Sequence, residues 1–480
     1  MIDKLKTAVE YLRSKGVTYG DARYVHTTRE AIKITNGTVD TLTNDVDQGF
    51  GIRVLADGAW GFASSAVCTA GEMKKVANRA LQIAKASALT KREAVKLAEQ
   101  DPVKGTYETP FETDPFKVTL SKKLKLLTKV NDILRKSPRI RVAESSMDFI
   151  RTHKIFVSTD GAEIDQWITE SGAGYAATAV GDGEVQRRSY PNSHRGDWGT
   201  GGYEFIERMD LVGNAERVRE EAIQLLTAPP CPSGPRTIII DGSQMALQVH
   251  ESCGHPTELD RVLGTEISLA GGSFLSLDKM GKFRYGSPKV TIVADATVHG
   301  GLGSFGYDDE GVPAQRFDLV RDGMFVGYLT SRETAPVIGQ RSNGTMRADG
   351  WNRVPLIRMT NINLEAGDAE LDALMADSDG ALFLETNKSW SIDDQRLNFQ
   401  FGLEAAWDIR GGKKGQIYKN PLYTGITPEF WNSCDAICNK NHWHIWGVPN
   451  CGKGEPMQTS RVAHGAAPAR FHNVTVGVSQ

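Results

Sequence analysis

The sequence predicts an α+β protein in which helices and antiparallel sheets occupy separate stretches of the chain. Helical and strand patterns are grouped along the sequence and do not alternate. Asn-Gly and Asp-Gly pairs, which favour two-residue hairpin turns, join successive strands. Glycine accounts for 49 of 480 residues, which is typical of a chain with many tight turns. We expect an N-terminal domain of antiparallel sheet with helices and a C-terminal β-rich domain of antiparallel sheets that carries a metal-site helix.

Helical patterns are spread through the first half of the chain. Apolar residues at helical spacing predict a first helix that ends at Gly16. Thr69, followed three residues later by Glu72, forms a capping box that starts a second helix. A third helix is expected near 120–134 and a fourth at 211–226. We interpret the lysines of the third helix as a solvated face, not a nucleic-acid track; they are Lys122, Lys123, Lys125 and Lys129.

Strands are expected between these helices. Turns at Asn36-Gly37 and Asp57-Gly58 predict hairpins between apolar runs. A meander of five short strands should follow, with turns at Asp160-Gly161 and Asp182-Gly183. Its expected strands are 139–151, 154–159, 162–170, 173–180 and 184–190.

A proline-rich segment, TAPPCPSGP, divides the sequence at 227–235. Neither a helix nor a central strand tolerates four prolines in nine residues. We therefore predict two domains, 1–226 and 236–480. The second opens on the apolar strand TIII and a short helix. Its further predicted strands are VTIVAD, FDLVRDGMFVGYLTS, ALFLETN and RLNFQFGLEAAWDI.

Charge and hydropathy exclude several classes of protein. Lys and Arg number 56 and Asp and Glu 59, so a net charge of −3 gives no support to nucleic-acid binding. No apolar run approaches the roughly 18 residues of a membrane helix, so we expect no membrane partner. The first residues lack the apolar core of a secretory signal, and we expect a cytoplasmic protein. Its six cysteines are then expected as thiols, ligands or nucleophiles and not as disulfides.

The strongest chemical pattern is His250-Glu251-Ser252-Cys253-Gly254-His255. In the related H-E-x-x-H motif, two histidines four residues apart face one metal from one side of a helix. Five residues apart, they would diverge by about 140° on an ideal helix. They meet only if the helix tightens, widens or ends between them, which Gly254 and Pro256 would permit. Glu251 would then act as general base toward a metal-bound water. A helix end with two hydrogen-bonded histidines is the alternative.

A third ligand must come from elsewhere, because a catalytic zinc usually has three protein ligands and one open position. Cys451 lies 201 residues after His250 in a glycine-flanked segment that we expect to be a loop; the alternative is a buried thiol. Cysteines and histidines at 434, 438, 442 and 444 also have ligand-like spacing. The residues of this group are Cys434, Cys438, His442 and His444. We favour core packing for the group, because its two cysteines form an apolar stripe with Phe430 and Ile437.

Two other features have simpler interpretations. The acidic run Asp308-Asp309-Glu310 is interpreted as a solvated turn, with substrate contact as the alternative. The preceding GGLGSFG follows a strand, but no helix pattern comes after it, so we do not expect a phosphate-binding loop. Cys253 is poorly placed as a nucleophile, because adjacent helical residues do not face one another.

The sequence resembles the TldD/PmbA family, whose members were historically called modulators of DNA gyrase and are now regarded as zinc metallopeptidases. The likeness covers nearly the whole chain. VDQGFGIRVLADGAWGFASS resembles the N-terminal signature, and HESCGHPTELDR, which includes Glu258 and Asp260, resembles the metal motif. GSFGYDDEGVPAQR, PLIRMTN and PNCGKGEP resemble later blocks in the same order. NSCDAICNKNHWHIWG and HGAAPARFHNVTVGV depart from the best-known members.

The resemblance implies one Zn²⁺ per chain, held by His250, His255 and Cys451, with Glu251 as the catalytic base. It also implies a cytosolic dimer, either a homodimer or a heterodimer with a metal-less PmbA-type paralogue, that trims small or unfolded peptides. The expected activity is zinc-dependent peptide hydrolysis. The alternatives are a metal-dependent amidase acting on a non-peptide substrate and a non-catalytic metal-containing scaffold subunit of a peptide-handling complex.

Overall fold

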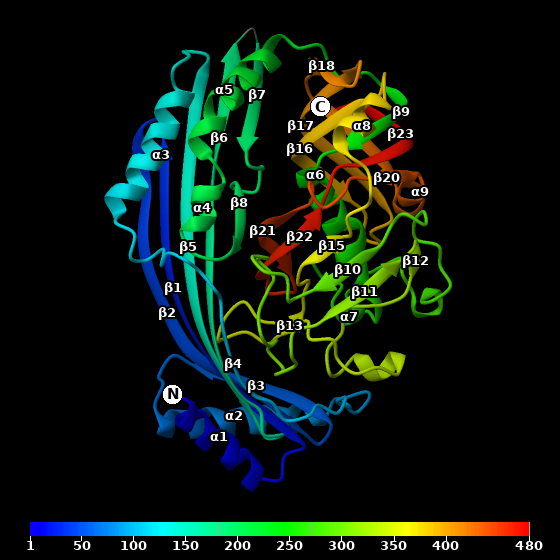
Figure 1. Cartoon of the computed structure of the whole chain (residues 1–480). Helices are drawn as coiled ribbons and strands as arrows, with labels where there is room; N and C mark the ends of the chain where they lie inside the picture. Colours follow the sequence, from blue (N-terminus) through cyan, green and yellow to red (C-terminus); the bar gives the residue numbers. More distant parts are fainter. Residues whose placement is uncertain (182, 270, 480) are drawn as a thin grey trace.

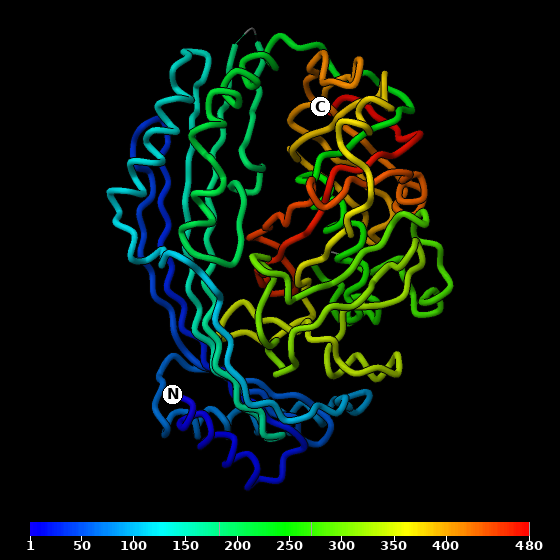
Figure 2. Tube along the Cα trace, in the orientation of Figure 1, coloured from blue at the N-terminus to red at the C-terminus, as the bar shows by residue number. Residues whose placement is uncertain are grey.

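A computed structural model describes residues 1–181, 183–269 and 271–479. The predicted α+β class is confirmed: the sheets are largely antiparallel, with β4–β6 and β9–β16 as parallel pairings. Figure 2 traces the chain from the N-terminus at the foot of a set of long strands to the C-terminus in the other half. None of the helices in the described part of the chain is long and apolar enough to cross a membrane.

The first half is built on a sheet that contains eight strands among the described residues, in the order β3-β2-β1-β5-β6-β4, with β7 and β8 also paired to β6. Figure 1 shows α1 and α2 at one end of the long strands and α3 and α5 at the other. Each helix pair covers its own apolar core. The strands are β1 (Tyr19–Thr35), β2 (Thr38–Ala56), β3 (Ala59–Ser65), β4 (Lys104–Glu108), β5 (Ile140–Ser158), β6 (Glu163–Gly181), β7 (Glu184–Tyr190) and β8 (Asp197–Thr200). The helices are α1 (Ile2–Ser14), α2 (Ala70–Ala88), α3 (Leu120–Leu134), α4 (Glu204–Arg208) and α5 (Leu211–Thr227).

The local turn and cap signals of this half are confirmed. Asn36 and Gly37 have φ of 51° and 82°, and the Asp57-Gly58 pair is also left-handed, as two-residue hairpins require. The Thr69 side chain caps α2 by accepting a hydrogen bond from the Glu72 backbone N–H. The predicted turn at Asp182-Gly183 includes Asp182, which lies outside the described residues.

The five-strand meander is wrong, because β5 and β6 each run unbroken for 19 residues. The predicted break between strands 162–170 and 173–180 falls at Ser171 and Gly172, which lie inside β6, as does Gly174. A Cβ on Gly172 would come within 2.1 Å of the Trp198 ring, and one on Gly174 within 2.2 Å of the Gly196 Cα. These glycines therefore admit the segment packed against the strand and do not form turns.

The lysine face of α3 also needs a correction. Lys122, Lys125 and Lys129 are exposed, as predicted, but Lys123 is fully buried. Its Nζ lies 2.6 Å from a carboxylate oxygen of Glu30 on β1. The ammonium group faces the sheet because it pairs with the Glu30 carboxylate on that side. The charge pattern of the helix alone does not reveal a partner on another element.

The remaining strands begin with β9, whose first residues, Gly234 and Pro235, still belong to the proline-rich segment. Among the described residues a seven-stranded sheet has the order β16-β9-β23-β19-β17-β18, with β20 on β23, and smaller sheets pair β12-β11-β10-β15, β13-β14 and β21-β22. The predicted strands TIII, VTIVAD, FDLVRDGMFVGYLTS, ALFLETN and RLNFQFGLEAAWDI are confirmed within β9, β10, β11–β12, β16 and β17. The strands are β9 (Gly234–Ile240), β10 (Ile292–Asp295), β11 (Arg316–Arg321), β12 (Met324–Phe325), β13 (Met346–Arg347), β14 (Leu356–Ile357), β15 (Ile362–Leu364), β16 (Leu382–Ile392), β17 (Asn398–Arg410), β18 (Lys413–Tyr418), β19 (Pro421–Ile426), β20 (Cys434–Ile437), β21 (His444–Lys453), β22 (Gln458–Ala466) and β23 (Ala469–Val478). The α-helices are α6 (Gly242–Val249), α7 (Leu259–Val262), α8 (Leu371–Ala376) and α9 (Thr427–Asn432).

The acidic run joins the two halves and is not a solvated turn. Asp308, Asp309 and Glu310 are each only 3% exposed. Asp309 accepts hydrogen bonds from Lys154 of β5 at 3.0 and 3.1 Å, and Glu310 lies 3.4 Å from Arg53 of β2. Burial would raise the pKa of Asp309, but its cationic neighbours outweigh that effect and lower it to about 2. The partners lie more than a hundred residues away, so the local sequence gives no sign of them.

Replacing Asp309 with alanine should lower the free energy of unfolding by about 3–5 kcal/mol, because it leaves the Lys154 ammonium beside a buried site without its counter-ion. The loss should be greatest at neutral pH. The folded-state pKa of about 2 lies below the ordinary 3.8, so the stabilisation exists above pH 4 and disappears as pH falls toward 2. Denaturant midpoints at pH 7 and pH 3 test this, with exposed Asp132→Ala as control. Equal midpoints for Asp309→Ala and the native protein at pH 7 would contradict it.

Candidate metal centre

The two motif histidines meet because the helix widens between them. The α6 helix passes at His250 into a π-helical turn, His250–Gly254, and then into a 3₁₀ turn, His255–Thr257. The His255 N–H bonds the His250 carbonyl five residues back. One π turn therefore places residues five apart above one another, and the two ring centroids lie 4.9 Å apart. Widening is one of the three routes that the spacing left open.

The glycine in this turn has a packing role. Gly254 has an ordinary helical φ of −55°, so the turn does not depend on glycine's conformational freedom. A Cβ at this position would lie 2.1 Å from the sulfur of Met359. Gly254 is therefore needed for the close approach of the neighbouring chain.

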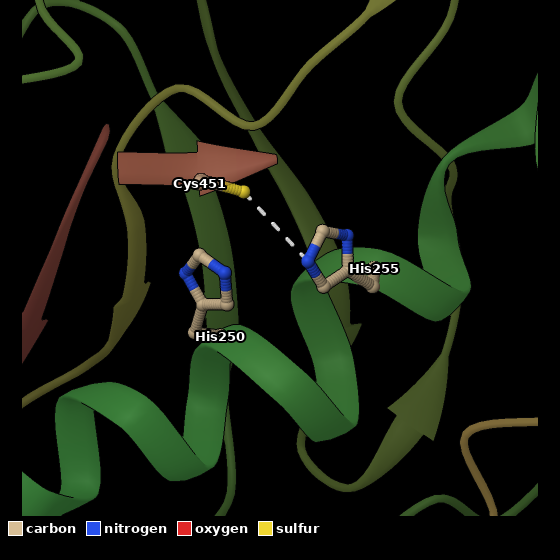
Figure 3. Close-up of side chains that lie close together, drawn as sticks. All are labelled: His250, His255 and Cys451. Atoms are coloured by element: carbon tan, nitrogen blue, oxygen red, sulfur yellow. Dashed lines mark hydrogen bonds between the residues drawn. The ribbon is translucent and has the colours of Figure 1, made fainter. Parts of the chain in front are cut away.

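Cys451 completes a buried cluster with the two histidines. One ligand atom from each of His250, His255 and Cys451 lies within 4.8 Å of the others, and this is the one such group of three among the described residues. Figure 3 shows the thiol reaching from its strand toward His255, with Sγ 3.7 Å from Nε2. Cys451 lies in β21 and not on the predicted loop. Register is interrupted between Val448 and Cys451, and such a bulge changes the direction of a strand's side chains.

His250 is held in one tautomer by His464, on β22. The Nδ1 of His464 faces the carbonyl oxygen of Ile362 at 3.0 Å and must donate to it, because a carbonyl only accepts. Burial and the nearby His250 hold the pKa of His464 well below its usual range, so its Nε2 is an acceptor. The His250 Nδ1, 2.7 Å away, therefore donates to it. This leaves the Nε2 lone pair of His250 available to a metal.

His255 is oriented in the same way by Glu258. Its Nδ1 lies 3.0 Å from a carboxylate oxygen of Glu258, which is also bonded by Arg261. Burial would raise the pKa of Glu258, but Lys453, His255 and Arg261 outweigh burial and lower it well below the usual value. Because an ionised carboxylate only accepts, His255 donates from Nδ1 and keeps its Nε2 lone pair.

The electrostatics single out one thiol among the six cysteines. Burial opposes ionisation of Cys451, but His255 and Arg358 outweigh it and lower the pKa of the thiol. At the other five cysteines burial raises the thiol pKa, to about 12 at Cys253 and about 11 at Cys438. A thiolate, and not a thiol, binds metal, so Cys451 is the cysteine best suited to be a ligand.

Glu251 lies beside the three residues, in a pocket of about 220 Å³. Its carboxylate accepts a hydrogen bond from Arg396 at 2.8 Å, and both side chains are 7% exposed. Arg396 is held in a left-handed backbone conformation, with φ of 61°. The pocket is also lined by His194, Trp390 and Asn450, so residues from both halves of the chain surround the carboxylate.

Two parts of the chain match models of one protein family. Residues 233–478, more than half of the chain, match the PmbA/TldA metallopeptidase C-terminal domain, and residues 20–84 match PmbA/TldA metallopeptidase domain 1. The chain belongs to the PmbA/TldA metallopeptidase family. This is the TldD/PmbA family that the sequence motifs predicted, and the predicted class of enzyme, a metallopeptidase, is confirmed with it.

Relatives of this PmbA/TldA metallopeptidase extend over most of its length. A metalloprotease of Methanocaldococcus jannaschii is 29% identical over 420 residues, 87% of this chain and 89% of its own. A zinc metalloprotease TldD homolog of Saccharolobus solfataricus is 21% identical over 471 residues, 96% of this chain and 97% of its own. The crystal structure of a Thermotoga maritima protein named as a modulator of a DNA gyrase is 17% identical. It covers 99% of both chains with a TM-score of 0.78, which shows a common fold.

The second cysteine and histidine group does not form a metal site. Cys434 and Cys438 are buried in the apolar core, as predicted. The segment is not helical, because α9 ends at Asn432 and Cys434 begins strand β20, so ligand-like helical spacing has no meaning there. His442 lies 3.3 Å from Glu370, and His444 lies 2.7 Å from Asp197. His442 and His444 in this PmbA/TldA chain therefore have separate carboxylate partners.

Three residues of the centre were missed from sequence: His464, Arg396 and Lys453. His464 belongs to the HGAAPARF segment that departs from familiar members of the family, and that departure was the available signal. Arg396 has no local signal, because it reaches Glu251 from the turn between β16 and β17. Lys453 lies two residues after Cys451 and bonds Asp260 of the metal motif at 2.7 Å.

Proposed function

We propose that this chain is a zinc-dependent peptidase that hydrolyses small or unfolded peptides, with Glu251 as general base. The observation that carries the proposal is the cluster of His250, His255 and Cys451 beside a carboxylate in a common pocket. A structural zinc usually has four protein ligands and needs no free carboxylate. Three donors with an adjacent glutamate are the set expected of a catalytic site, so the scaffold alternative is disfavoured.

The residues present fit a metal ion. All three donors are buried, and the Nδ1 atoms of both histidines are engaged by His464 and Glu258. That arrangement directs two Nε2 lone pairs and a low-pKa thiolate at one another, which is unfavourable unless a cation lies among them. Imidazole and thiolate donors suit zinc, and zinc is named for the Saccharolobus solfataricus relative.

The residues around the cluster have distinct parts in hydrolysis. When bound, zinc would act as a Lewis acid that polarises the scissile carbonyl and acidifies the attacking water. Glu251 would accept the proton of that water and return it to the leaving amine. Arg396 would orient the Glu251 carboxylate through their 2.8 Å hydrogen bond. The walls of the pocket would exclude bulk water and admit an extended chain more readily than a folded one.

The proposal also covers the location, the assembly and the substrate of the enzyme. We propose a cytoplasmic protein that forms a dimer with itself or with a metal-less paralogue. A metal-dependent amidase acting on a non-peptide substrate would use the same hydrolytic groups. Only a substrate screen separates that activity from peptide hydrolysis.

Removal of the metal tests the proposed function directly. Chelation should abolish cleavage of a mixture of unstructured peptides, and one equivalent of zinc per chain should restore it, because water activation depends on the Lewis acid. Mass spectrometry of the products measures both steps. A stable folded protein should resist the enzyme, while the same protein unfolded should be cut. Full activity in the chelated protein would disprove the proposal, and equal cleavage of folded and unfolded substrates would disprove the selectivity.

A further inference from the structure

A second cavity of about 360 Å³ lies on the face of the large sheet opposite α3 and α5. Residues of β1, β2, β5, β6 and β7 line it, together with the turn that joins β7 to β8. The side chains there are strongly polar. The charged ones are Arg29, Lys33, Arg187, Arg195, Glu144 and Asp148.

The cavity carries more positive than negative charge. Its two carboxylates are already paired: Asp148 lies 2.6 Å from Arg29, and Glu144 lies 2.7 Å from Lys33 and 3.5 Å from Arg187. Arg195 is exposed and makes no ion pair with any described residue. The guanidinium of Arg195 therefore has no anionic partner among the described residues of the cavity, and an anionic ligand would supply one.

The backbone around Arg195 is fixed by a hydrogen bond and by close packing. Asn192 is buried, and its side chain accepts a hydrogen bond from the His194 N–H at 2.8 Å. Arg195 itself adopts a left-handed conformation, with φ of 60°, which is strained for a residue with a side chain. Gly196 follows with φ of 87°, where a Cβ would lie 1.8 Å from the Ala173 carbonyl oxygen. Such strain persists where the surroundings fix the residue, often at binding sites.

The same segment borders the pocket that contains Glu251. His194 lines that pocket, and Arg195, the next residue, lines the cationic cavity. Consecutive Cα atoms are about 3.8 Å apart, so the two cavities are neighbours on either side of this turn. An extended peptide advances about 3.3 Å per residue. The bound carboxylate would then lie only a few residues along the peptide from a bond held beside Glu251, on the other side of the His194-Arg195 turn.

We propose that the cavity around Arg195 is a subsite that binds a carboxylate of the peptide substrate. The inference rests on the proposed peptidase function and adds a substrate class to it, namely peptides with a negative charge close to the scissile bond. A guanidinium suits this ligand because it can form two parallel hydrogen bonds with a carboxylate. The carboxylate belongs either to the peptide's C-terminus or to an Asp or Glu side chain.

One eight-residue unstructured peptide in four forms tests the subsite. The forms combine a free or amidated C-terminus with an internal Glu or Gln. The wild-type protein, loaded with zinc, should show kcat/KM about tenfold to a hundredfold higher for the two forms that retain the recognised carboxylate. Sensitivity to amidation assigns the C-terminal carboxylate, and sensitivity to Gln assigns the side chain. Fluorescence anisotropy with zinc-loaded Glu251→Gln measures the same preference as affinity, without turnover.

Arg195→Asn should remove the preference and leave cleavage of the amidated Gln form unchanged. Asparagine tolerates the left-handed conformation, and Arg195→Gly serves as a second variant with less backbone strain. Arg92→Asn, at an exposed site far along the chain, is the matched control and should behave as wild type. Equal kcat/KM and equal affinity for all four forms, or a preference that survives both Arg195 variants, would overturn the subsite. If wild type cleaves none of the four forms, the proposed function fails, and the affinities still decide whether Arg195 binds a carboxylate.

Discussion

Glu251→Gln should keep one zinc per chain and lose peptide hydrolysis by about 10²- to 10⁴-fold, the usual contribution of a general acid–base group. Glu251 is outside the cluster formed by His250, His255 and Cys451, so metal content should not change. Glutamine keeps an oxygen that accepts the hydrogen bond from Arg396, so the pocket should keep its shape. It cannot take a proton from water, and the loss should therefore appear in kcat more than in KM.

A matched control separates chemistry from the cost of removing a buried charge. Glu404 is also buried and paired with an arginine, Arg188, at 3.4 Å, but it lies outside the Glu251 pocket. Glu404→Gln should lose stability comparably and retain its rate. Elemental analysis and single-turnover cleavage of an unstructured peptide measure the two properties. Wild-type rates in Glu251→Gln would show that the base is another group, and zinc loss in that variant would make Glu251 a ligand.

Local signals in the sequence predicted local structure well. The cap at Thr69 and the turn at Asn36-Gly37 depend on residues at most three positions apart, and both are present in the structure. The wider turn at His250–Gly254 was one of several possibilities, because spacing shows that the helix must change but not how. Where the physics is contained in a few neighbouring residues, the sequence is sufficient.

Charged residues whose partners come from distant strands were not predictable. Asp309 and Lys123 looked like solvated charges, yet each is buried against an opposite charge from another part of the chain. No residue spacing pointed to His464, because β22 reaches the centre by pairing with β21, the strand that carries Cys451. Buried charge requires a partner, and the sequence does not show which of many charged residues that partner is.

Cys451→Ala should lose most of the zinc, whereas Cys434→Ala and Cys438→Ala should keep it. By spacing alone the latter pair looks more ligand-like, although its apolar stripe favoured core packing, and the family likeness selected Cys451. The structure supplies a physical basis for the difference. Burial raises the thiol pKa at Cys434 and Cys438, while at Cys451 His255 and Arg358 outweigh burial and lower it. Only Cys451 presents sulfur to the two histidines, so its loss leaves two ligands in place of three.

The pH dependence of metal binding follows from the same groups and strengthens the test. Zinc requires a thiolate and two neutral imidazoles, so affinity should fall as pH decreases and protons compete for these atoms. Cys434→Ala and Cys438→Ala should show the wild-type profile and differ only in stability, because they lose apolar packing in the core. Elemental analysis of the purified variants after dialysis at pH 8, 7 and 6 measures occupancy. Full zinc in Cys451→Ala, or loss in Cys434→Ala at pH 8, would move the metal away from this cluster.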